Sequence, residues 1–133
     1  MLIDFADREI ASPVQGFDTL HVSPVDLKHL RRYTMGDRDL EREVLDLFLG
    51  QLPETIRSLS RASTEREWRV AAHTLKGSGR AVGAWQVARL AEHAERDVNV
   101  LNRIRCSEFV ARIEEAAEEV RCFIEASYPA RAA

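Results

Sequence analysis

Residues 45–59 of the chain read Leu-Asp-Leu-Phe-Leu-Gly-Gln-Leu-Pro-Glu-Thr-Ile-Arg-Ser-Leu. Large apolar residues recur in this stretch at spacings of three and four, which is the period of one face of an α-helix. The stretch therefore predicts a helix over residues 37–60. Pro53 inside it predicts a kink, because proline removes a backbone donor. The buried stripe of this helix is predicted to be Leu45, Phe48, Leu52, Ile56 and Leu59.

Helix-start signals stand on both sides of this stretch. Upstream, Ser23-Pro24-Val25-Asp26 predicts a short helix through about Arg32, with Ser23 as its cap. Downstream, Thr64 with Glu67 three residues later forms a capping-box pattern. It predicts a third helix that lasts until Gly83.

Two more helices are predicted beyond Gly83. The fourth precedes a polar connection at 97–105, and the fifth begins at Ser107-Glu108 and lasts until Pro129. These three later helices carry inward stripes of their own: Trp68, Ala71, Ala72, Leu75, Gly79 and Val82 in the third; Val87, Ala91 and Ala94 in the fourth; Phe109, Ile113, Ala116, Val120, Phe123 and Ile124 in the fifth.

The fold class that follows is all-α. One short helix and four longer ones with short connections favour an antiparallel up-and-down four-helix bundle with a short additional N-terminal helix. We assign residues 23–128 to the bundle, 1–22 to an N-terminal arm and 129–133 to a C-terminal tail. The length of 133 residues fits a single domain.

Composition excludes several classes of protein. The chain has 19 Lys and Arg against 22 Asp and Glu, a net charge of −3 that argues against general nucleic-acid binding. No apolar run reaches the roughly 20 residues of a membrane span, and residues 1–10 lack the order of a signal peptide. We expect a cytoplasmic monomer whose cysteines, Cys106 and Cys122, are reduced structural thiols.

The stretch at 72–84, Ala-His-Thr-Leu-Lys-Gly-Ser-Gly-Arg-Ala-Val-Gly-Ala, carries the chemistry. On a helix, His73, Lys76, Gly77 and Arg80 share the flank opposite the apolar stripe. Gly77 costs about 1 kcal/mol there relative to alanine. A glycine one turn from an exposed imidazole leaves room for another macromolecule, and the two cations favour an anion.

An exposed imidazole with these neighbours can take up and release a phosphoryl group, because the histidine side chain, with a reference pKa of about 6.5 in peptides, is in general a nucleophile near neutral pH. Metal-binding patterns are missing: His21, His29 and His93 have no ligand spacing, so no metal site is expected. A DNA-binding helix-turn-helix at residues 83–90 is a further alternative, against which the net charge and the apolar Val87 argue.

The motif resembles that of the histidine-containing phosphotransfer (HPt) domains of bacterial phosphorelays. The matching residues are His73-Thr74-Leu75-Lys76-Gly77, Gly83-Ala84, Leu90 and Glu95, with Gly36-Asp37, Leu47-Phe48-Leu49, Pro53 and Trp68 upstream. The resemblance covers about residues 24–126. It does not extend to residues 1–22.

The resemblance implies a role for each matching residue. His73 would accept the phosphoryl group on Nε2, and Lys76 would lie near the phosphoryl oxygens. Gly77 would give the partner clearance. Glu95 would orient the imidazole by accepting a hydrogen bond from Nδ1–H, which leaves Nε2 free.

The partners that the resemblance implies are receiver domains of response regulators and sensor or hybrid histidine kinases. The Mg²⁺ of transfer would belong to the receiver, so no cofactor is expected, and the chain would be an intermediate without kinase activity of its own. We expect the partner surface to include Arg69, Val70 and Arg80 around His73, with Leu49 and Pro53 from the adjoining helix. The alternative is an adaptor that docks receivers or kinases without carrying phosphate.

Overall fold

The computed structural model describes residues 23–97 and 99–129, and within them the chain forms five helices. They are α2 (Leu27–Thr34), α3 (Arg38–Arg61), α4 (Glu65–Val82), α5 (Trp85–Asp97) and α6 (Arg103–Ser127). The predicted arm at 1–22 lies outside the described residues, as does the predicted tail apart from Pro129.

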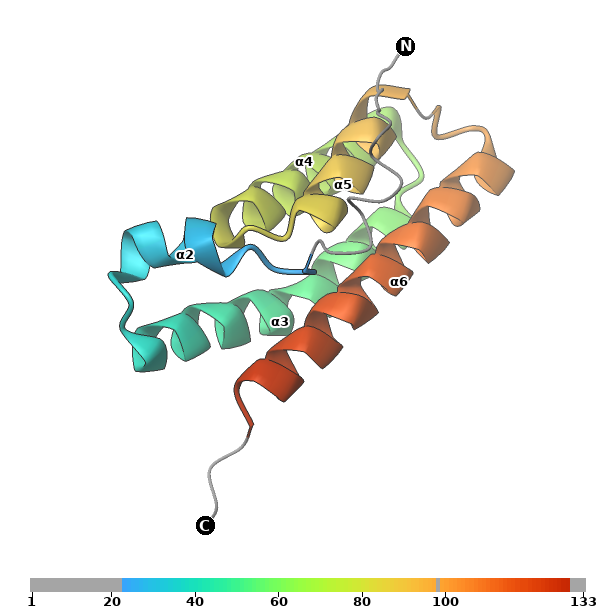
Figure 1. Ribbon diagram of the computed structural model, residues 1–133. Coiled ribbons are helices and arrows are strands. Elements are labelled where there is room, and N and C mark those ends of the chain that lie inside the picture. The colour runs from blue at the N-terminus through green and yellow to red at the C-terminus, as the bar shows by residue number, and fades with distance from the viewer. Residues whose placement is uncertain (1–22, 98, 130–133) are drawn as a thin grey trace, which may run out of the picture.

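The helices α3 to α6 form the bundle, and each packs against the next, with α6 closing the ring against α3 (Figure 1). The short helix α2 lies at one end and contacts α3 and α4. The predicted all-α bundle with a short additional N-terminal helix is therefore confirmed.

The core is built from the predicted stripes. All five stripe residues of α3 and all six of α4 are buried. In α5 and α6 the stripes are buried as well, except that Phe123 is only partly buried. Each fully buried large apolar side chain contributes roughly 1.5–3 kcal/mol. The stripes that the helical period predicts therefore supply much of the apolar burial that stabilises the bundle.

Two helix starts differ from the prediction. The N-cap of α2 is Asp26, whose Oδ1 accepts from the backbone N–H of His29 at 3.1 Å, whereas the predicted cap Ser23 donates its hydroxyl to the carbonyl of Val25. The start of α6 lies four residues before the predicted Ser107, because Asn102 caps it by accepting from the N–H of Arg105. In both places, the residue directly before the first helical residue accepts a hydrogen bond from a free backbone N–H of the first turn.

Other helix ends follow the prediction. Thr64 caps α4 by accepting from the N–H of Glu67 at 3.1 Å. Asp37 caps α3, which continues as one helix through Pro53; the kink at Pro53 stays a prediction.

Gly83 ends α4 in a left-handed conformation and joins it closely to α2. Its φ is 83°, and a Cβ there would lie 2.8 Å from the carbonyl oxygen of Asp26. The N–H of Asp26 donates to the Gly83 carbonyl at 2.9 Å, and the indole of Trp85 donates to the Asp26 carboxylate at 2.9 Å. Only glycine fits this position, which fixes α2 against the α4–α5 turn.

A buried carboxylate ties α2, the start of α3 and the end of α6 together at this same end of the bundle, which the sequence did not predict. Glu41 is 1% exposed; it accepts from Arg31 Nε at 2.8 Å and from the Tyr128 hydroxyl at 2.8 Å. Arg38 and Arg42 donate to backbone carbonyls of Ser127 and Tyr128. These contacts hold the end of α6 against the start of α3.

The two cysteines differ in their surroundings. Cys106 is buried, whereas Cys122 is exposed, so the prediction of a structural thiol fits Cys106 and is wrong for Cys122.

Among the described residues, no helix combines the length and the apolar character that crossing a membrane requires.

Candidate functional site

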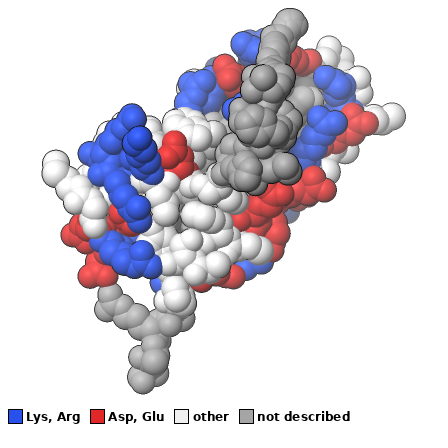
Figure 2. Space-filling model, viewed as in Figure 1, with Lys and Arg blue, Asp and Glu red and all other residues white. Residues whose placement is uncertain are grey.

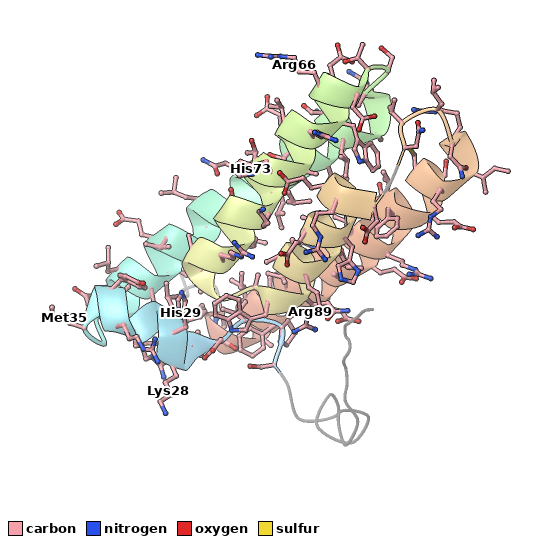
Figure 3. The ribbon with its side chains drawn as sticks, turned by 90° about the horizontal axis from the view of Figure 1, so that it is seen from above. Lys28, His29, Met35, Arg66, His73 and Arg89 are labelled. Carbon is pink, nitrogen blue, oxygen red and sulfur yellow. The ribbon has the colours of Figure 1, made fainter. Side chains whose placement is uncertain are left out.

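His73 lies in the middle of α4 and points away from the bundle (Figure 3). Its side chain is 69% exposed. The neighbouring residues Ala72 and Leu75 are buried, so the helical period places the imidazole on the outer side. The predicted exposure of this histidine is therefore confirmed.

Glu95 on α5 contacts both His73 and Lys76. Its Oε2 lies 3.1 Å from His73 Nδ1, and its Oε1 lies 2.7 Å from Lys76 Nζ. Contact with Lys76 lowers the pKa of Glu95 below its ordinary value of 4.5; partial burial opposes this shift, and the contact with His73 adds to it. Glu95 is thus a carboxylate at neutral pH that two partners share.

The contact with Glu95 determines which ring nitrogen of His73 is free. An ionised carboxylate only accepts hydrogen bonds, so Nδ1 carries the hydrogen and donates it. In the neutral imidazole, Nε2 then holds the lone pair. Because the ring is mostly exposed, this nucleophilic nitrogen is accessible to a partner.

Lys76 and Glu95 are less exposed than the histidine. The side chain of Lys76 is 17% exposed and that of Glu95 is 21% exposed. The ammonium of Lys76 is engaged with the carboxylate of Glu95.

Two glycines on α4 serve different purposes. Gly77 is exposed, and a Cβ built on it would meet nothing within 4 Å. Gly79 is buried, and a Cβ there would lie 3.2 Å from the Cβ of Ala88 on α5. Gly79 therefore lets α4 and α5 pack closely, and Gly77 keeps the surface beside His73 clear.

The other cations near the histidine also have partners. The guanidinium of Arg80 lies 3.6 Å from Oε2 of Glu92 on α5. The guanidinium of Arg96 lies 3.9 Å from the same oxygen. Arg69 pairs with Glu65 one turn earlier on α4. These pairs are exposed and are worth about 1 kcal/mol or less each, so an incoming anion can compete for the guanidinium groups.

Basic side chains also gather over α2 on the face seen in Figure 2. This helix contains Lys28, Arg31 and Arg32. Since the chain as a whole carries a net charge of −3, this positive charge is local.

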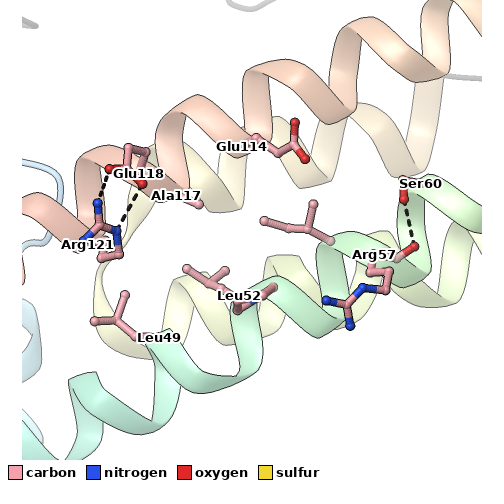
Figure 4. Close-up of a pocket in the computed structure, with 10 residues that line it drawn as sticks. Leu49, Leu52, Arg57, Ser60, Glu114, Ala117, Glu118 and Arg121 are labelled. Atoms are coloured by element: carbon pink, nitrogen blue, oxygen red, sulfur yellow. Dashed lines mark hydrogen bonds and ion pairs between the residues drawn. The ribbon is translucent and has the colours of Figure 1, made fainter.

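The predicted partner residues fall into two groups. Val70 is 56% exposed and lines a groove between α3 and α4 with Thr74, Thr55 and Ser58. Leu49 and Pro53 instead line a separate groove between α3 and α6 (Figure 4). Arg69, Val70 and Arg80 are therefore exposed residues of α4, the helix that carries His73, whereas Leu49 and Pro53 lie in the groove between α3 and α6.

The register of α3 explains this difference. Leu49 packs partly against the core, facing α6, whereas Thr55 and Ser58 face α4. The apolar pattern identifies which side of α3 is buried, but it does not say which neighbour lies on which side. Thr55 and Ser58 are α3 residues beside Val70, and the sequence reasoning did not single them out.

Within residues 23–97 and 99–129, the His, Cys, Asp and Glu side chains form no cluster of three or more that could hold a metal ion.

In this four-helix bundle, the exposed histidine in the middle of α4 contacts a carboxylate of α5 through Nδ1. A family model, the Hpt domain, matches residues 43–122, and the chain belongs to this family of histidine-containing phosphotransfer domains, which act in two-component phosphorelays. The match includes His73, Lys76, Gly77 and Glu95. No curated protein and no solved structure shows a significant match to this chain.

Proposed function

We propose that this chain carries phosphoryl groups between receiver domains, and that His73 is the acceptor. The observation that carries the proposal is the exposed imidazole whose Nδ1 contacts Glu95 at 3.1 Å and whose side chain is 69% exposed. Membership of the Hpt domain family supports the class of reaction.

In the proposed step, the lone pair of His73 Nε2 attacks the phosphorus of an aspartyl phosphate on the receiver. A phosphorus–nitrogen bond forms, the bond from phosphorus to the aspartate oxygen breaks, and its electron pair leaves with the aspartate carboxylate. The same step in the reverse direction passes the group from His73 to an aspartate of another receiver. Positioning and charge neutralisation carry most of such a transfer, and the Mg²⁺ would come with the receiver.

Glu95 is the residue that we propose orients the acceptor. Attack by Nε2 leaves the ring with a positive charge, since Nδ1 keeps its hydrogen. A carboxylate 3.1 Å from Nδ1 stabilises that charge through a charge-assisted hydrogen bond. The phosphorylated ring therefore needs no proton transfer before it can donate.

The partner is proposed to dock on the outer side of α4. Val70 offers an exposed apolar side chain, Arg69 and Arg80 offer charge, and Gly77 leaves open space next to His73. The groove with Thr55 and Ser58 extends this surface to α3. Such a small mixed surface suits a transient encounter.

The test is transfer from a receiver domain that has been phosphorylated with acetyl phosphate. We expect the chain to gain a label that is labile in acid and stable in base, and we expect His73→Gln to gain none. His93→Gln is the matched control and should be labelled like the wild type, because His93 lies on α5 and is only partly exposed. Labelling of His73→Gln would refute the proposal, and binding of the receiver without any labelling would favour the adaptor alternative.

A further inference from the structure

The net negative charge of the chain lies in residues 1–22, ahead of the bundle. Residues 23–133 contain equal numbers of acidic and basic side chains, whereas residues 1–22 have a net charge of −3. Most of the acidic side chains of that segment stand close together, and large apolar side chains stand next to them. Residues 2–10 contain Asp4, Asp7 and Glu9 together with Leu2, Ile3, Phe5 and Ile10.

The helix α4 offers a surface of complementary character. Its four cations and two carboxylates give it a net charge of +2. Exposed residues recur along one side of it at spacings of three and four, so they lie next to one another. We call this side the acceptor face; it consists of Arg66, Arg69, Val70, His73, Gly77 and Arg80.

The arginines of the acceptor face are available to an added carboxylate. Arg66 forms no ion pair with any other residue that the structure describes. Arg69 and Arg80 have partners, but the guanidinium groups are 61% and 52% exposed, and such pairs are weak in water. Between these cations, Val70 is 56% exposed and Gly77 leaves open space for a second backbone.

The helix α2 is basic as well, but it is a poorer match. Its Arg31 is engaged with the buried Glu41, and the ring of its Tyr33 contacts that of His29 edge to face. It also contains no glycine, so its surface has no gap into which a peptide backbone could fit.

The path of the chain brings residues 1–22 close to the acceptor face. The N–H of Asp26 donates to the carbonyl of Gly83 at 2.9 Å, so the chain enters α2 beside the end of α4. His73 lies ten residues before Gly83, about 15 Å along the helix axis. About five extended residues span that distance, and thirteen positions separate residue 10 from Ser23.

We propose that residues 2–10 bind the acceptor face of the same chain and cover His73 until a partner displaces them. The inference rests on the proposed function, because it concerns access to that histidine. The carboxylates pair with the arginines of α4, and the apolar side chains beside them contact Val70. Since the segment is tethered, its effective concentration is of the order of 1 mM, so even a weak contact covers the face in a large fraction of the molecules.

A nitroxide label locates the segment. Ala6→Cys carries the label in a Cys122→Ser background, since Cys122 is exposed and Cys106 is buried. We expect the label to broaden the backbone amide signals of residues 66–80 more than those of α6. In a mixture of labelled ¹⁴N protein and unlabelled ¹⁵N protein, no such broadening is expected, because the contact lies within one chain.

Neutral side chains in the segment should open the acceptor face. We expect the triple variant Asp4→Asn, Asp7→Asn, Glu9→Gln to lose the broadening on α4. Transfer from a phosphorylated receiver to His73 should become about threefold faster, because a larger fraction of the molecules is open to the partner.

A matched control removes the same number of negative charges elsewhere. The triple variant Glu114→Gln, Glu115→Gln, Glu119→Gln changes exposed positions of α6. It should keep the broadening on α4 and transfer at the rate of the wild type.

Several results would overturn the inference. Broadening that is strongest on α2, or even over the bundle, would mean that the segment does not bind the acceptor face. Broadening in the mixed sample would make the arm of a second copy the occupant. Transfer that is unchanged in the neutral variant would show that the segment does not restrict access, and slower transfer would show that it helps the partner to bind. If no receiver labels the wild type at His73, the proposed function fails, whereas the position of the nitroxide still decides whether the segment binds α4.

Discussion

Two carboxylates in this bundle are each shared between a cation and a second hydrogen-bond donor, and the two second donors differ in their exposure to solvent. Glu41 is shared between Arg31 and the hydroxyl of Tyr128, and Glu95 is shared between Lys76 and the imidazole of His73. The pKa of each is lowered, first by its cationic partner. The difference lies in the neutral donor: Tyr128 is 3% exposed, whereas the His73 side chain is 69% exposed.

The comparison shows that two similar sets of contacts leave different groups accessible to solvent. At Glu41 all the hydrogen-bonding capacity is directed inward and joins α2, α3 and the end of α6. At Glu95 the carboxylate fixes one nitrogen of a ring and leaves the other nitrogen in solvent. The buried hydroxyl of Tyr128 is part of a structural link, whereas the exposed imidazole of His73 has a second nitrogen in solvent, which is the feature on which the proposed function rests.

Removal of Glu41 should give the largest change. We expect Glu41→Ala to lower the free energy of unfolding by about 3 kcal/mol, because it leaves the buried hydroxyl of Tyr128 without an acceptor and leaves a cavity. Urea unfolding followed by circular dichroism measures this. A loss of less than about 1 kcal/mol would mean that the Glu41 cluster is not a structural link.

Acid should affect the Glu41 cluster next. The folded-state pKa of Glu41 is below its ordinary value of 4.5, chiefly because Arg31 donates to it. Its contribution to stability is therefore present above the unfolded pKa and is lost as the pH falls through the folded pKa. We expect the melting temperature to fall on acidification below about pH 4.5. The fall should be shallower in Glu41→Gln, and equal slopes in the two proteins would contradict this assignment.

The smallest effect on stability is expected at the other carboxylate. Glu95→Ala should change the free energy of unfolding by about 1 kcal/mol or less, since Lys76 and His73 can both turn to water. The same urea experiment measures it. A loss as large as that of Glu41→Ala would remove the distinction between the two clusters.

The sequence predicted the core well because burial in a helix follows a simple period. Every stripe residue of α3 and α4 is buried as expected. His73 and Gly77 were likewise identified from their spacing on a helix, and Glu95 from the resemblance to the HPt family; the structure places His73 and Glu95 in contact.

What the sequence missed depends on contacts between distant residues. Nothing local indicates that Glu41 is buried, because its partner Tyr128 lies 87 residues away. The contact of Lys76 with Glu95 also joins two helices. The positions of Leu49 and Pro53 required knowledge of which helix lies on each side of α3, and an apolar period does not contain it.

The indole of Trp68 fixes how α5 lies along α4. Its Nε1 donates to the carbonyl of Ala94 at 2.8 Å, and Ala94 directly precedes Glu95. A shift of α5 by one residue would be about 1.5 Å along its axis and would break this bond. The spacing between His73 and its carboxylate is thus set from inside the bundle, by a side chain that no partner reaches. Changes to the outer surface of α4 can therefore accumulate without disturbing the contact between His73 and Glu95.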